Sequence, residues 1–178
     1  MLELHIRGRE SWDEEKEEFL YDSADVKLEH SLVSLSKWES KYCKPFLSRE
    51  EKTPEETIDY IRFMALNEVS HDVFDFLTES DMRKIEKYIE SPMTATTFSK
   101  DPNRYGSSEQ VTAELIYYWM IALNIPFECQ YWHLNKLLTL IRVCNIKNQS
   151  PKKRSARDIM NRNAALNSSR RKKYNTRG

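Results

Sequence analysis

Residues 112–148, TAELIYYWMIALNIPFECQYWHLNKLLTLIRVCNIKN, form the longest apolar stretch with helical spacing in the chain. Its apolar side chains recur three or four positions apart, first as Leu115, Tyr118, Trp119, Ala122 and Leu123, and then as Leu134, Leu137, Leu138, Ile141 and Cys144. Between the two sets, Pro126 lacks a backbone N–H and disfavours helical geometry at Ile125. We therefore predict two helices within about residues 109–146, joined by a tight bend at 124–126.

A short connection makes consecutive helices antiparallel neighbours, so the two apolar stripes are expected to bury each other. Tyr117, Tyr131 and Trp132 need a third surface to cover them. The predicted fold class is α+β and mainly α. An antiparallel helical hairpin forms its centre, with a small N-terminal antiparallel β-sheet and a basic C-terminal arm added to it.

The length of 178 residues suffices for one domain with a sizeable core, which we place at residues 1–148. Only three residues are glycine and 31% are charged, which favours helices over glycine-rich turn architectures. We expect no membrane span, because charges interrupt the most apolar window at Glu114, Glu128, Lys136 and Arg142. The start of the chain is acidic, unlike a signal peptide, and no C-x-x-C pair occurs, so we expect a cytosolic protein with reduced, mostly buried thiols at Cys43, Cys129 and Cys144.

The first 33 residues alternate apolar and polar side chains, which predicts two or three short antiparallel strands. The alternation runs through Leu2, Leu4 and Ile6, then Phe19 and Tyr21, and then Val26, Leu28, His30 and Leu32. We expect turns at Gly8 and at residues 22–25. A sheet this small must pack on the helices to be stable.

Capping signals place further helices. Ser36 with Glu39 predicts a helix start with an end near Lys44, and Thr53-Pro54-Glu55-Glu56 predicts another. A brief helical segment is expected at residues 73–77, and an amphipathic helix before Ser91-Pro92, with Asp81, Arg83, Lys84, Glu86 and Lys87 on its solvated face. Residues 93–108 are expected to form an exposed loop that could begin with an edge strand, and Ser107 and Gln110 are the predicted caps of the helix that follows.

The neutral net charge hides a division of the chain. From Lys147 to Gly178, eleven Lys and Arg stand against Asp158 alone, which gives +10 and leaves −10 for the rest. We expect residues 149–178 to form an arm that is helical, from Ser155 to about Leu166, or ordered by a partner. Three interpretations of the arm stay open: a solvated tail, a contact for nucleic-acid phosphates, or docking on an acidic protein surface. The residues considered for docking on a protein are Lys152, Lys153, Arg154, Arg170 and Arg171.

The motifs of common enzymes are missing from the sequence. It contains no G-x-G-x-x-G, no G-x-x-x-x-G-K-[ST], no H-E-x-x-H and no G-x-S-x-G, so we expect neither catalysis nor a cofactor. Cys129 and His133 have the spacing of one helical face, but a zinc site needs a third ligand, and we favour a buried thiol and a structural histidine. Glu114 and Glu128 are better explained as solvated side chains than as an acid–base pair.

Consecutive aromatic residues cannot all enter one core. Tyr117, Tyr118 and Trp119 in the first central helix, with Tyr131 and Trp132 in the second, therefore predict an aromatic edge. The simpler interpretation is core plus a partly exposed flank, and the sharper one is a protein-binding surface, because Trp and Tyr are typical interface anchors.

Five segments together carry a family resemblance: HSLVSLSKWESKY (30–42), EKTPEETIDYIRFM (51–64), SPMTATTF (91–98), the whole of 112–148, and RNAALNSSRRKK (162–173). From residue 30 onward, about four fifths of the chain resembles the tail assembly chaperones of long-tailed bacteriophages. The resemblance implies a non-enzymatic protein of the host cell cytoplasm. Its implied partners are the tape measure protein, kept soluble until the tail tube forms, and the tail tube protein.

Two other functions remain as alternatives. A virion structural protein of the neck or tail would thread its basic arm into an acidic neighbour. A nucleic-acid-binding protein would use the same arm on phosphates, but the acidic remainder of the chain disfavours this as the main role. The sequence leaves the oligomeric state open, and a homo-oligomer stays among the expected assemblies.

Overall fold

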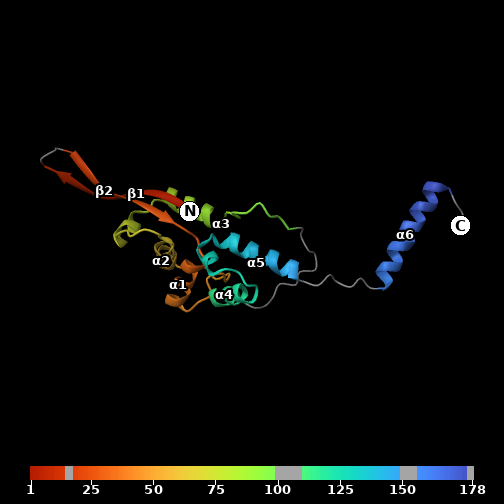
Figure 1. Cartoon of the computed structure of the whole chain (residues 1–178). Coiled ribbons are helices and arrows are strands. Elements are labelled where there is room, and N and C mark those ends of the chain that lie inside the picture. The colour runs from red at the N-terminus through yellow and green to blue at the C-terminus, as the bar shows by residue number, and fades with distance from the viewer. Residues whose placement is uncertain (15–17, 99–109, 149–155, 176–178) are drawn as a thin grey trace. The chain divides into compact units, whose positions relative to one another are not determined.

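The computed structural model describes residues 1–14, 18–98, 110–148 and 156–175. Within these residues the protein is mainly helical, with one two-stranded antiparallel sheet at the start of the chain (Figure 1). The predicted fold class is therefore confirmed. In chain order the elements are β1 (Leu2–Asp13), β2 (Glu18–Leu28), α1 (Leu32–Tyr42), α2 (Pro54–Met64), the 3-10 helix η1 (His71–Phe76), α3 (Glu79–Glu90), α4 (Ala113–Ala122), the 3-10 helix η2 (Phe127–Tyr131), α5 (Leu134–Asn148) and α6 (Ala156–Tyr174).

The sheet is a single hairpin. Leu2 lies opposite Leu28 and Trp12 opposite Phe19, with a register shift between Arg7 and Glu10. The predicted turn at Gly8 is therefore a bulge inside β1, and the predicted turn at 22–25 is wrong, because those residues continue β2. The buried sheet residues, Leu4, Ile6, Val26 and Leu28, lie where β1 begins and β2 ends. This part of the hairpin is thus the one anchored in the core.

The start of α1 differs from the prediction. Ser31, in extended geometry, accepts from the Ser34 backbone N–H, and the Ser34 hydroxyl oxygen accepts from the Ser31 N–H. This reciprocal cap begins the helix at Leu32 and leaves Ser36 inside it, so the predicted cap at Ser36 and the strand at Leu32 are both wrong. Cys43 ends the helix in the left-handed region (φ 53°) and is exposed, contrary to the expected burial.

Glu39, the second half of the predicted box at Ser36, serves a longer-range purpose. Its buried carboxylate accepts the backbone N–H of Phe46 and, from Ala113, the N–H at the start of α4, each at 2.7 Å. The side chain thereby ties α1 to a helix that begins 74 residues later.

The caps of α2 and α3 follow the same logic. The predicted box of Thr53 and Glu56, with Pro54 in the first turn, is confirmed. Thr78 and Asp81 form an equivalent box on α3, so Asp81 is buried rather than solvated as predicted. Residues 93–98 contain no strand, and α4 is capped by Thr112 in place of Gln110, which is exposed; residue 107 lies outside the described residues.

The predicted break at 124–126 is present, but the second central helix begins later than expected. Asn124 adopts a left-handed conformation (φ 53°), and η2 with its flanking turns then occupies the chain up to Leu134. The connection is therefore longer than a tight bend. The main backbone neighbour of α4 is α1 rather than α5.

Two apolar clusters make up the core. One joins the sheet to α1, α2, η1 and α3 through Leu4, Val26, Trp38, Ile61, Met64 and Ile85. The other joins α1, α4 and α5 through Leu32, Leu35, Ile116, Met120, Leu134 and Leu137. The helical pair predicted at the centre is thus a three-helix cluster, in which α1 supplies the additional surface.

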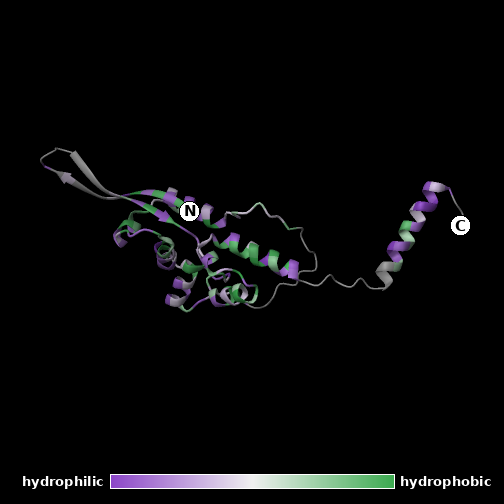
Figure 2. Ribbon diagram, viewed as in Figure 1, coloured by the Kyte–Doolittle hydropathy of each residue, from purple (hydrophilic) through white to green (hydrophobic). Residues whose placement is uncertain are grey.

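The contacts divide the chain into Met1–Cys144 and Asn145–Gly178. The second unit includes α6, which continues to Tyr174, eight residues beyond the end predicted at Leu166. All side chains from 160 to 175 are exposed, and Figure 2 shows that most of the described part of this helix is hydrophilic. None of the helices in the described part of the chain is both long and apolar enough to cross a membrane.

Candidate functional site

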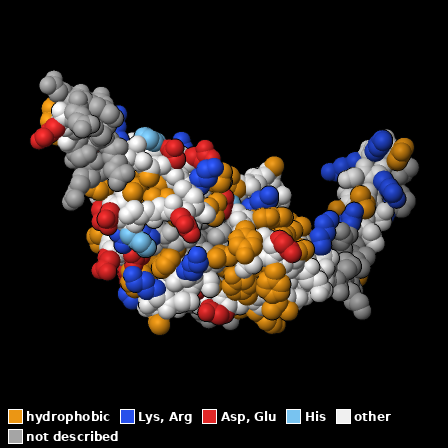
Figure 3. Space-filling model, turned by 60° about the vertical axis from the view of Figure 1, so that its left-hand side comes forward, with side chains coloured by type: hydrophobic (Ala, Val, Ile, Leu, Met, Phe, Trp, Pro, Cys, Tyr) orange, Lys and Arg blue, Asp and Glu red, His pale blue; other side chains and the backbone are white. Residues whose placement is uncertain are grey.

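The outer side of α4 and the 3-10 helix that follows it carry large hydrophobic side chains in water. Their exposed fractions are 62% for Tyr118, 60% for Ile121, 52% for Phe127, 61% for Tyr131 and 38% for Trp132. We call these five residues the aromatic surface. Figure 3 shows hydrophobic side chains gathered over a broad part of one face of the protein. Exposed groups of this kind mark binding sites more often than isolated apolar residues do.

Local sequence explains why α4 exposes one side. Ala113, Ile116 and Met120 recur at helical spacing and are fully buried, which turns Tyr118 and Ile121 outward. A charged or small residue at these outer positions would make α4 an ordinary amphipathic helix. The residues present make it apolar on both sides.

A contact between α4 and η2 holds the two parts of the aromatic surface together. The ring of Tyr117 stacks on Phe127 with centroids 6.4 Å apart, and its hydroxyl donates to Gln130 Oε1 at 3.0 Å. Burial, reinforced by the nearby Tyr131, raises the pKa of Tyr117 and keeps the hydroxyl protonated as that donor. The aromatic surface therefore rests on a fixed support rather than on independent loops.

The predicted interface residues separate into three groups. Tyr118, Tyr131 and Trp132 are exposed, and the Lys136 ammonium lies 4.3 Å from the Trp132 ring centre. Tyr117 and Trp119 are half-buried against the core. Arg170 and Arg171 are exposed on α6, whereas Lys152, Lys153 and Arg154 lie outside the described residues.

Sequence reasoning missed Ile121 and Phe127. Ile121 is three positions after Tyr118, so helical periodicity alone would have placed it on the same outer side. Phe127 carried no such signal. It was predicted to be near the start of a helix, and only the 3-10 geometry of η2 shows that it is exposed.

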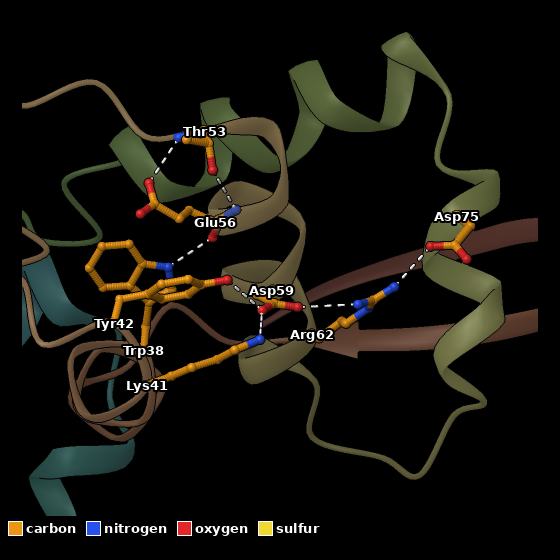
Figure 4. Close-up of polar contacts among 8 residues, drawn as sticks. All are labelled: Trp38, Lys41, Tyr42, Thr53, Glu56, Asp59, Arg62 and Asp75. Atoms are coloured by element: carbon orange, nitrogen blue, oxygen red, sulfur yellow. Dashed lines mark hydrogen bonds and ion pairs between the residues drawn. The ribbon is translucent and has the colours of Figure 1, made fainter.

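The charged face between α1 and α2 is a second candidate site (Figure 4). The Asp59 carboxylate accepts from Lys41, from the Tyr42 hydroxyl at 2.6 Å and from Arg62 at 3.1 Å, and Arg62 also pairs with Asp75 at 2.8 Å. Burial of Asp59 opposes ionisation, but the hydrogen bonds from Lys41 and Tyr42 outweigh it and lower the pKa of the carboxyl. Its acceptor positions are already used within the protein, which is typical of a structural ion pair.

Glu56 in the same region is similarly committed. It completes the α2 cap with Thr53 and accepts from Lys44 at 2.8 Å, while its backbone carbonyl accepts from the Trp38 indole at 2.8 Å. A small hollow beside it is lined by Trp38, Lys44 and Lys52 among others. The bonds of Glu56 join α2 to Trp38 of α1 and to Lys44 just after α1, which is a structural role.

The Cys129 and His133 pair does not have the geometry of a metal site. His133 Nε2–H donates to the Tyr88 carbonyl at 3.1 Å, and Nδ1 accepts from the Asn135 N–H at 3.3 Å, so both ring nitrogens have partners. Among the described residues, no group of three or more candidate ligands is close enough to hold a metal. Glu114 and Glu128, the other pair considered, are both exposed.

Comparison with known proteins found no matching family model, no similar curated protein and no similar solved structure. The aromatic surface is therefore interpreted from its own geometry and from the sequence segments described above.

Proposed function

We propose that this protein is a tail assembly chaperone, which binds the tape measure protein through the aromatic surface and helps the tail tube polymerise around it. The observation that carries the proposal is the exposure of the aromatic surface, whose two parts are joined by the stacked rings of Tyr117 and Phe127. The resemblance of the sequence segments to that family supplies the identity of the partner.

The chemistry of the aromatic surface suits a long, partly unfolded polypeptide. Aromatic side chains bury much area at little cost in side-chain entropy, and their ring edges and hydroxyls accept varied polar neighbours. Tyr118 and Tyr131 combine a ring with a polar tip in this way. A surface of this type binds successive apolar segments of a chain without requiring one sequence.

The basic arm adds a second contact in this proposal. On α6, Arg170, Arg171, Lys172 and Lys173 follow one another, and all four are exposed. A hydrophilic helix of this length is marginal in water by itself, so an acidic partner would stabilise it by binding. The arm would then raise the rate of encounter while the aromatic surface provides the affinity.

Co-expression with the tape measure protein tests the proposal. We expect the wild-type protein to increase the soluble fraction of the tape measure protein, and the double variant Tyr118→Ser/Tyr131→Ser to lose that effect with about tenfold weaker binding. Phe76→Ser is the matched control, because Phe76 is 41% exposed but belongs to η1. Equal activity of the double variant and the control would contradict the role of the aromatic surface.

Mass spectrometry of purified particles separates this proposal from a virion structural role. An assembly chaperone leaves before the particle is complete, so it should be absent from virions. Recovery of the protein in stoichiometric amounts would favour a neck or tail accessory protein. Failure of the wild-type protein to solubilise the tape measure protein would overturn the chaperone proposal itself.

A further inference from the structure

The two edges of the β-hairpin differ in how they are covered. Along β2, the segment after α2 satisfies the outward backbone groups: Glu29 N–H donates to the Met64 carbonyl at 2.9 Å, and Leu66 N–H donates to the Lys27 carbonyl at 2.8 Å. The Asn67 side chain extends this cover, accepting from Lys27 N–H and donating to the Asp25 carbonyl, both at 2.9 Å. The end of β2 is thus closed to further strands.

The same bonds determine which groups of β1 point outward. In an antiparallel ladder, a residue whose N–H and C=O point away from its neighbour lies opposite a residue that does the same. Lys27 lies opposite Glu3, and Asp25 lies opposite His5. The backbone groups of Glu3 and His5 therefore point away from β2, at the free edge of β1.

The edge of β1 lacks the hydrogen bonds that close β2: η1 and α3 pack near β1, but none of the described residues bonds to the outward N–H and C=O of Glu3 or His5. Both side chains are exposed, at 64% for Glu3 and 60% for His5, while Leu4 and Ile6 between and beyond them enter the core. An ordered strand with unsatisfied edge groups is a template for another strand.

The charge pattern of β1 points to the strand that fits. Only residues with outward groups can hydrogen-bond across the new pair, and the bulge after Arg7 ends the regular edge. If β1 pairs with another antiparallel strand so that His5 lies at the centre, the whole regular edge before the bulge takes part in the pairing. This pairing places His5 opposite His5 of a second copy, Glu3 opposite Arg7, and Leu4 opposite Ile6 on the core side.

This register places Glu3, whose carboxylate pairs with Lys27 of its own chain at 3.6 Å, opposite Arg7 of the second copy, and opposite charges directly across a pair stabilise a sheet. Each His5 Nδ1 lies 2.8 Å from the carboxylate of its own Asp25, so each imidazole at the centre already has a hydrogen-bond partner. We propose that a second copy of this chain adds its β1 to this edge, making a four-stranded sheet around a two-fold axis at His5. The contact is isologous, which makes it a closed dimer.

Sedimentation of the full chain over a range of concentrations tests the dimer. We expect Glu3→Arg to raise the dimer dissociation constant about tenfold, because the substituted side chain of each copy would lie opposite Arg7 of the other copy and repel it. The double variant Glu3→Arg/Arg7→Glu restores both pairs in reversed order and should return within about threefold of wild type. Glu86→Arg, an exposed change of the same charge on α3, is the control and should have no effect.

Cross-linking gives a second measurement that does not depend on charge. Hydrogen-bonded antiparallel partners have Cα atoms about 5.5 Å apart, within the range of a disulfide. His5→Cys in a Cys43→Ser background should therefore form a disulfide-linked dimer on oxidation, whereas Glu86→Cys in the same background should not. A wild-type chain that is monomeric at all concentrations, a double variant that stays weak, or equal cross-linking of the two cysteine variants would each overturn the proposal.

Discussion

Helices α3 and α4 both bury apolar side chains, but the exposed side of α3 is charged and that of α4 is hydrophobic. On α3, Ile85 and Tyr88 enter the core while Arg83, Lys84, Glu86 and Lys87 face water. On α4, Ile116 and Met120 enter the core while Tyr118 and Ile121 face water. The exposed side of α3 is therefore an ordinary solvated surface, whereas the exposed side of α4 carries the kind of side chains found in protein interfaces.

The largest expected loss of stability comes from substitutions on the buried sides of the two helices. Ile116 and Ile85 are 0% and 2% exposed, so Ile116→Ala and Ile85→Ala should each lower the free energy of unfolding by about 2–5 kcal/mol. Urea denaturation measures both. A cost below about 1 kcal/mol for either variant would contradict the packing assigned to that helix.

The contact between α3 and the residues just before α5 should respond to pH. The His133 ring, whose Nε2–H donates to the Tyr88 carbonyl of α3, lies 5.1 Å from the His30 ring, and His30 Nδ1 is 2.6 Å from the Tyr60 hydroxyl. Burial, assisted by His133, lowers the pKa of His30 to about 3, and burial also lowers the pKa of His133. Both imidazoles are therefore neutral in the folded protein near pH 7.

In the unfolded chain the two imidazoles bind protons near pH 6.5, whereas in the folded chain they do not. The free energy of unfolding is therefore highest above pH 6.5 and decreases as the pH falls toward about 3. The lowered pKa of His30 alone should reduce the free energy of unfolding by about 2 kcal/mol between pH 6.5 and 5. Urea titrations at several pH values measure the slope. His30→Gln should flatten it and the exposed His5→Gln should not; a slope that His30→Gln leaves unchanged would show that other groups control it.

A smaller difference is expected at the helix starts. Thr78 caps α3 reciprocally with Asp81, so Thr78→Ala should cost about 1 kcal/mol. The hydrogen bond from Leu115 N–H to Thr112 is long, at 3.4 Å, and Glu39 already accepts from the Ala113 N–H. Thr112→Ala should therefore cost less in thermal or urea unfolding, and the reverse order would show that the Glu39 contact contributes little.

The smallest effect on stability is expected where the two helices differ most. Tyr118→Ser on α4 and Glu86→Ser on α3 should each change the free energy of unfolding by less than about 0.5 kcal/mol, since both side chains lie mainly in water. If Tyr118→Ser destabilised the isolated protein strongly, Tyr118 would belong to the core and the comparison would fail.

Local signals predicted part of this fold well. The cap at Thr53 and the break at Asn124 depend on residues adjacent in the chain, and both are present. The cap expected at Ser36 failed because Ser31, five residues earlier, competes for the same helix and has its own partner in Ser34. In sequence, Ser36 with Glu39 matches the standard capping box and Ser31 with Ser34 does not, whereas in the structure the earlier start accompanies burial of Leu32 and Leu35.

The candidate site shows the same limit. Adjacent aromatics predicted an exposed edge, but they did not say which rings would face water: Trp119 is half-buried, whereas its neighbour Tyr118 is exposed. Phe127 joined the aromatic surface through the geometry of η2. The side of a helix that enters the core depends on its neighbours, and here the neighbour is α1, which ends 71 residues before α4 begins.

The sequence alone determined the mainly helical class, the N-terminal hairpin and the basic character of the C-terminal arm, because periodicity, alternation and charge are properties of neighbouring residues. Tertiary structure decided that α1 completes the second core cluster, that Asn67 closes one edge of the hairpin, and that five hydrophobic side chains stay in water. Those outcomes depend on contacts between residues far apart in the chain, and no local pattern encodes which distant segments meet.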